Sequence, residues 1–146
     1  MLTVKNIRIK AMINEAYADT PSFYDYRIRV LTEDVLFELP TGEHVLIKKG
    51  FEWDETTVPW YLTWAFPKSG KYAFSALIHD ALYYAGYKSQ KFADDTFYAF
   101  MLVTVSKTQA KIRWQMVRLF GRIYWNKNIK NPSKRAISNK QLVIIS

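Results

Sequence analysis

The chain has 146 residues, of which 49% are hydrophobic and 16% aromatic, and it contains no cysteine. This length favours one domain with a sizeable core, and the lack of thiols excludes a disulfide framework and a thiolate zinc site. The net charge of +8 is concentrated in residues 107–146, where ten Lys and Arg side chains are accompanied by no Asp or Glu. That imbalance indicates an anionic partner or a solubilising role.

The first half of the chain predicts β-strands. Residues 27–30 alternate basic and apolar side chains, as a half-buried strand does. The segments DVLFEL and HVLIKK flank a Pro-Thr-Gly-Glu sequence that predicts a β-hairpin. An earlier strand within residues 3–13 is expected to join the same antiparallel sheet. Residues 50–70 carry two prolines and three tryptophans, which predicts an irregular, aromatic-rich loop.

The second half predicts helices. The first covers residues 72–85 and ends at Gly86, the second covers residues 90–104 with Ser89 as its N-cap, and the third covers residues 108–125 after Ser106 or Thr108. Residues 127–146 are polar and basic and predict a loosely held tail, although the closing QLVIIS has the composition of a strand that docks back.

Strands followed by helices predict an α+β fold, with an N-terminal antiparallel sheet and hairpins packed against a C-terminal bundle of about three helices. We expect a single domain over residues 1–126 and a basic tail over residues 127–146. No run approaches the roughly 20 apolar residues of a membrane-spanning helix, so no membrane span is expected.

The third predicted helix is amphipathic. On a helical wheel a basic stripe forms a candidate anion-binding face, which can equally be an ordinary solvated face; it consists of Lys107, Lys111, Arg118 and Arg122. The opposite side is apolar and is expected to face the core; it consists of Ile112, Met116, Leu119, Phe120 and Ile123. Arg113 lies toward this apolar side, so we expect a buried carboxylate, Asp80 or Asp94, to pair with it.

Adjacent His79 and Asp80 stand on the almost wholly apolar helix AFSALIHDALYYA. A short loop brings the next helix alongside, so Asp94 is expected to converge with them, and Asp54 in the preceding loop is the fourth candidate. Three interpretations remain open for this set: a hydrogen-bonded core pair, a proton-transferring acid–base unit, or a divalent metal site. His44, on a predicted strand, is the one other histidine, so no metal ligands and no cofactor are assigned.

Four motifs occur in order: GFEWDETTVPW (residues 50–60), ALIHDALYY (76–84), FADDTFYAFM (92–101) and RLFGRIYW (118–125). Together they resemble the phage-associated domain of unknown function 1353 family over about residues 24–125. The resemblance carries over to a set of shared positions: Gly50, Phe51, Asp54, Pro59, His79, Asp80, Leu82, Tyr83, Ala93 and Asp94. The chain departs from the family pattern at Trp60, where the family tends to have an arginine.

The resemblance implies a phage or prophage origin and supplies no activity. We therefore expect a virion-associated or assembly component that acts by contact with other phage proteins. It would be made in the host cytoplasm and incorporated in the virion. The first alternative is a small hydrolase that uses the His79, Asp80, Asp54 and Asp94 set with or without a divalent metal, and the second is an accessory protein that contacts nucleic acid through its basic C-terminal region. The sequence decides neither whether the protein is an enzyme nor which substrate or partner it has.

Overall fold

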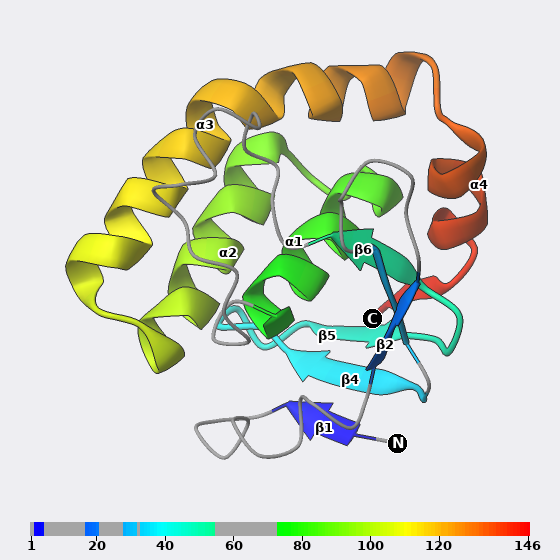
Figure 1. The fold of residues 1–146 in the computed structure, drawn as a ribbon, viewed down its shortest axis with the longest axis horizontal. Helices are drawn as coiled ribbons and strands as arrows, with labels where there is room; N and C mark the ends of the chain where they lie inside the picture. Colours follow the sequence, from blue (N-terminus) through cyan, green and yellow to red (C-terminus); the bar gives the residue numbers. More distant parts are fainter. Residues whose placement is uncertain (1, 5–16, 21–27, 32, 55–72) are drawn as a thin grey trace.

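The structure is a computed structural model that describes residues 2–4, 17–20, 28–31, 33–54 and 73–146. In this part of the chain the strands form two small sheets and four helices follow (Figure 1). The fold is therefore α+β, which confirms the class predicted from the order of strand and helix patterns.

The first sheet has four strands in the order β1-β4-β5-β7, which are β1 (Leu2–Val4), β4 (Val35–Glu38), β5 (His44–Ile47) and β7 (Val143–Ile145). The predicted hairpin is confirmed, since β4 and β5 pair antiparallel with Phe37 opposite Val45. The turn is closed by a hydrogen bond from the Gly42 amide to the Leu39 carbonyl at 2.9 Å. Gly42 has a φ of +88°, which a residue without a Cβ adopts at little cost.

The two outer strands of this sheet differ in how well the sequence predicted them. β7 pairs antiparallel with β5, which confirms that the closing apolar residues return as a strand. The strand expected within residues 3–13 joins this sheet through Thr3 and Val4 of β1, but β1 pairs parallel with β4 rather than antiparallel. Residues 5–13 of that prediction lie outside the described residues. A parallel neighbour requires a crossover connection, and the pairing direction of strands far apart in sequence cannot be inferred from their alternation.

The second sheet is antiparallel and has the order β2-β3-β6, which are β2 (Tyr17–Thr20), β3 (Ile28–Leu31) and β6 (Glu52–Asp54). Its strand β3 covers residues 28–30 of the strand that was predicted over residues 27–30, and residue 27 lies outside the described residues. Part of the region predicted as an aromatic loop is therefore the strand β6, and the remainder of that prediction, residues 55–70, lies outside the described residues.

The helices are α1 (Ala73–Ala85), α2 (Gln90–Thr104), α3 (Lys107–Lys130) and α4 (Lys134–Lys140). A serine precedes each of the last three and accepts a hydrogen bond from a backbone amide of the first turn, as N-capping residues do. The Ser89 cap was predicted from the sequence, and Ser106 was one of two candidates, the other being Thr108. The third, Ser133, opens a helix that was not predicted.

Residues 127–146 are not the loosely held tail that their polarity predicted. They form the last turn of α3, the helix α4 and the strand β7. Three features hold this segment in a defined structure. Ser133 caps α4, the side chains of Ala136 and Asn139 are buried, and β7 pairs with β5. Composition misled the prediction because a few anchoring residues are enough to hold a largely charged segment in place.

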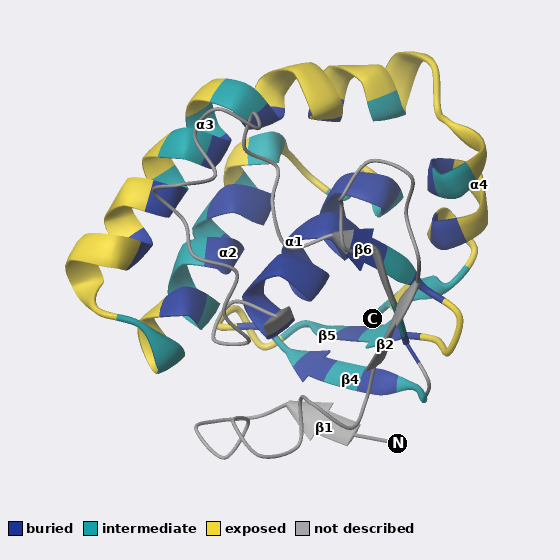
Figure 2. Cartoon of the chain, in the orientation of Figure 1, coloured by how far each residue is buried: buried dark blue, intermediate teal, exposed yellow. Residues whose placement is uncertain are grey.

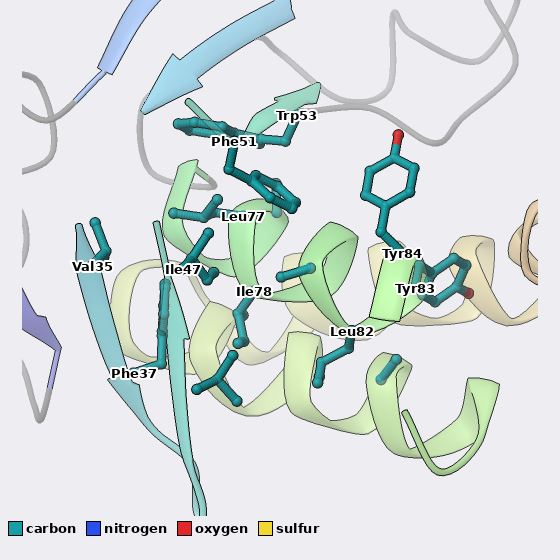
Figure 3. Packing of buried hydrophobic residues seen from close by; sticks show 14 of the residues in the cluster. Val35, Phe37, Ile47, Phe51, Trp53, Leu77, Ile78, Leu82, Tyr83 and Tyr84 are labelled. Atoms are coloured by element: carbon teal, nitrogen blue, oxygen red, sulfur yellow. The ribbon is translucent and has the colours of Figure 1, made fainter. Parts of the chain in front are cut away.

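Helix α1 lies at the centre of the fold and contacts α2, α3, α4 and β6. Nearly all of it is buried, in contrast to α3, whose outer face is exposed (Figure 2). Phe51 and Trp53 pack over the same helix that presents Leu77 and Tyr84 (Figure 3). The sheet contributes Phe37, whose ring meets Phe74 and Phe100 edge to face. A helix inserted in this way has no solvent face, which is why its sequence is almost wholly apolar.

Helix α3 is rotated relative to the prediction. Its buried residues are Ala110, Arg113, Val117, Gly121 and Trp125. Three of the side chains predicted to face the core, Ile112, Leu119 and Ile123, are exposed. The prediction placed the face with most of the large aliphatic side chains inward, whereas the structure packs the opposite face, with Gly121 and Trp125 among its residues, against the bundle.

Candidate closed polar cluster between three helices

The sharp turn between α1 and α2 sets the geometry of the candidate site. Gly86, with a φ of +61°, donates its amide to the Tyr83 carbonyl, and the next amide, of Tyr87, reaches the Leu82 carbonyl. This is the Schellman pattern that ends a helix. Lys88 also has a positive φ, and Ser89 then caps α2. The two helices consequently run side by side, and His79 on α1 faces Asp94 on α2.

Asp94 is the centre of a hydrogen-bonded group that joins α1, α2 and α3. Its Oδ1 lies 2.7 Å from His79 Nε2 and accepts a hydrogen bond from the Tyr83 hydroxyl, also at 2.7 Å. Its Oδ2 accepts hydrogen bonds from Gln90 Nε2 at 3.2 Å and from Arg118 Nη1 at 2.9 Å. We call these five residues the Asp94 cluster. The carboxylate is completely buried, and both of its oxygens are occupied.

The imidazole of His79 is enclosed by carboxylates and aromatic rings. Its Nδ1 lies 3.9 Å from Asp80 Oδ1, so a carboxylate stands near each ring nitrogen. The rings of Tyr83 and Phe97 lie 4.3 and 4.7 Å away, measured between centroids. Burial lowers the pKa of His79, but the Asp80 and Asp94 carboxylates outweigh it and raise the pKa above the ordinary value of 6.5. The arrangement therefore favours an imidazolium.

Tyr83 fits into the cluster because α3 has a glycine beside it. A Cβ added at Gly121 would overlap the Tyr83 hydroxyl and would also crowd Gln90 Nε2 at 3.4 Å. On its other side the Tyr83 ring packs edge to face against Trp125. Burial and the Asp94 charge raise the pKa of the Tyr83 phenol, so it stays a neutral donor. The close approach of α1 and α3 thus depends on Gly121.

The sequence predicted part of this arrangement. His79, Asp80 and Asp94 are brought together as expected, whereas Asp54 ends β6 and its side chain lies outside the described residues. Tyr83 and Gln90 were not foreseen as Asp94 partners. The available signal was spacing: Tyr83 follows His79 by four residues and Gln90 precedes Asp94 by four, so each pair shares a helix face.

Arg118 is the partner of Asp94 that the sequence analysis assigned elsewhere. It was placed in the basic stripe, but the structure directs it to Asp94, while Lys107, Lys111 and Arg122 are exposed. Arg113 is buried, as its position on the wheel predicted. The pairing of Arg113 with Asp80 or Asp94 stays a prediction. The guanidinium that the structure pairs with Asp94 is that of Arg118.

The chemistry open to the Asp94 cluster is limited by its closure. His79 is 2% exposed and Asp94 is 0% exposed, so a proton on the imidazole is shared with carboxylates rather than offered to solvent. Within the described residues, no three or more His, Asp and Glu side chains are arranged as a set that could hold a metal ion. The cluster in this conformation joins three helices and presents no reactive group at a surface.

Two further polar contacts, both unpredicted, join the sheets to the helices. The Tyr87 hydroxyl and the Lys88 ammonium both donate to the Glu43 carboxylate, the latter at 2.6 Å, and so attach the β4–β5 hairpin to the α1–α2 turn. Asn139 on α4 accepts from the Glu52 amide at 3.1 Å and donates to the Glu52 carbonyl at 2.7 Å. Its side chain thus pairs with β6 as a neighbouring strand would.

None of the helices in the described residues has both the length and the apolar content that a membrane crossing requires.

Comparison with known proteins places the chain in a family without supplying an activity. No curated protein and no solved structure matches the chain. The family described as "Protein of unknown function (DUF1353)" matches residues 29–117, which include the hairpin, α1, α2 and the first turns of α3. Because the match covers more than half of the 146 residues, the chain belongs to the DUF1353 family.

Proposed function

We propose that this protein acts by protein–protein contact, as a component of a phage particle or of its assembly, and that the Asp94 cluster is structural. The observation that carries the proposal is the closure of that cluster. A general acid or base must come within hydrogen-bonding reach of a substrate. Both oxygens of Asp94 are instead engaged by its own neighbours, and the carboxylate has no exposed surface.

The surface supports the same proposal. Large apolar side chains are exposed along α3. Exposure to water does not stabilise an isolated protein, whereas burial against a partner would stabilise a complex. The basic residues of the same region supply charge that can steer an acidic partner. The phage setting is supported by the resemblance of the four sequence motifs to a phage-associated family, and it forms part of the proposal.

The proposal is tested by recovering the tagged full chain from cells that naturally produce it. Light scattering after gel filtration gives the mass of the recovered species, and nuclease treatment removes nucleic acid. We expect a complex of fixed stoichiometry that contains at least one other protein and survives the nuclease. Recovery of the free monomer alone would refute the proposal. A complex that dissociates on nuclease treatment would favour a nucleic-acid accessory role in its place.

A further inference from the structure

The outer face of α3 carries a row of exposed apolar side chains. Ile112 is 44% exposed, Leu119 is 70% exposed and Ile123 is 69% exposed. These side chains lie opposite the face that packs on the bundle, and the outward side of α3 is exposed along most of its length (Figure 2). Side chains of this size seldom line up on a free surface by chance, so the row is a candidate for contact with another molecule.

The spacing of the row is that of helix–helix packing. With the partly buried Met116 it forms a series that we call the outer seam: Ile112, Met116, Leu119 and Ile123. Successive members are separated by four, three and four residues, which is the a/d pattern of a heptad repeat. At about 1.5 Å per residue the seam is about 17 Å long. Such a narrow stripe matches one helix laid along α3 better than the broad apolar face that inserts into a bilayer.

The charges beside the seam indicate the chemistry of the partner. Arg122 occupies the g position just before Ile123, and Lys127 occupies the e position one turn beyond Ile123, at the end of the seam; both are exposed. No Asp or Glu occurs anywhere in residues 107–146. A second copy of α3 docked on the seam would bring like charges together, which is unfavourable. A helix with acidic flanks would instead form ion pairs with Arg122 and Lys127.

We propose that the outer seam of α3 binds an amphipathic α-helix of a partner protein, with Leu or Ile at its a and d positions and Glu or Asp at its e and g positions. The inference rests on the proposed function, because it assigns the surface and the partner chemistry for the same contact role. The Asp94 cluster holds the inner face of α3 through Arg118, which leaves the seam pointing outward on a fixed support.

The test uses two synthetic helical peptides of about three heptads. Both have Leu at a and d, and one has Glu at e and g while the other has Lys. Binding to the full chain is followed by fluorescence anisotropy of the labelled peptide at two salt concentrations. The seam variant is Leu119→Gln combined with Ile123→Gln. Its control is Ile137→Gln, which removes a side chain on α4 that is 51% exposed. Arg122→Glu is compared with Lys48→Glu, a charge reversal at an exposed residue beyond β5.

We expect the acidic peptide to bind and the basic peptide not to bind. The double seam variant should weaken binding at least about tenfold, as loss of central apolar contacts does, and Ile137→Gln should leave it unchanged. Arg122→Glu and added salt should weaken binding, while Lys48→Glu should not. Equal binding of both peptides, an unaffected seam variant or no binding at all would overturn the inference.

Two other occupants have distinct signatures, and either would overturn the inference. Binding to vesicles of phosphatidylcholine and phosphatidylglycerol, lost in the seam variant, would assign the face to a membrane surface. Concentration-dependent dimers, lost in the seam variant, would assign it to a second copy. Cross-linking of the natural complex separates the two proposals: a complex joined elsewhere refutes the seam and keeps the contact function, whereas recovery of only free monomer refutes the contact function itself.

Discussion

Replacing Asp94 by Asn tests whether the buried cluster stabilises the fold. The substitution keeps the shape of the side chain but turns one acceptor oxygen into a donor. With the amide oxygen on the His79 side, its NH₂ group faces Gln90 Nε2 and Arg118 Nη1, which can only donate. In the opposite orientation it faces His79 Nε2 and the Tyr83 hydroxyl, both of which would have to stop donating in order to accept from it. The substitution therefore breaks or reverses two of the hydrogen bonds to Asp94 and removes the buried charge that His79 and Arg118 neutralise.

The magnitude follows from these contacts. A hydrogen bond to a charged group contributes about 1.5–3 kcal/mol, and removing one partner of a buried ion pair costs about 3–5 kcal/mol. Because Arg118 is about one-third exposed, it can turn toward water, which reduces its share. We expect Asp94→Asn to lower the free energy of unfolding by about 3–5 kcal/mol.

The measurement is urea denaturation followed by circular dichroism, with Asp95→Asn as the matched control. Asp95 is the next residue, its side chain is 45% exposed, and it bonds to Lys91 and Trp114. The control should lose less than about 1 kcal/mol, as exposed pairs do. If the two variants lose equal stability, the Asp94 cluster does not stabilise the fold and the reasoning given for it is wrong.

Three further predictions concern contacts described above. Because the carboxylates raise the pKa of His79 above 6.5, protonated His79 contributes fully to the free energy of unfolding below pH 6.5, and this contribution is lost as pH rises through the folded-state pKa. The free energy of unfolding measured from pH 6 upward should show this loss in the wild type and not in His79→Gln. Gly121→Ala should cost about 1–3 kcal/mol through overpacking despite better helix propensity, and adding Tyr83→Phe should make the pair clearly non-additive in a double-mutant cycle; strict additivity would contradict the proposed overlap. Asn139→Ala should cost about 1–3 kcal/mol and speed hydrogen exchange at the Glu52 amide, and unchanged exchange there would refute the strand-like role of Asn139.

The elements that the sequence predicted well are those with local signals. The serines before α2 and α3 and the glycine after α1 mark helix ends by capping rules that depend on nearby residues only. The β4–β5 hairpin follows from a proline and a glycine in its turn. The meeting of His79 with Asp94 was predictable for a similar reason, because a short connection forces two helices side by side.

The features that the sequence did not predict depend on contacts between distant segments. A helical wheel places Ile112 and Leu119 on an apolar face of α3, but the buried face is the one that carries Gly121 and Trp125, where Gly121 lets α3 approach Tyr83 of α1. The same rotation brought Arg118 to Asp94. Asn139 could not be assigned at all from its neighbours, because its role appears only when Glu52 lies beside it.

The pairing of β7 with β5 has a consequence for how the chain folds. The β4–β5 hairpin closes a loop of a few residues, whereas β7 follows all four helices in the sequence and pairs with β5 across that long separation. Loop-closure entropy makes that late contact less favourable by roughly 2–3 kcal/mol, and contacts so distant in sequence form slowly. Until β7 arrives, one side of β5 has unsatisfied amides and carbonyls beside Val45 and Ile47. A chain in which β7 has not yet paired therefore presents an open strand edge of the kind that recruits other chains into aggregates, and the pairing of β7 with β5 closes that edge.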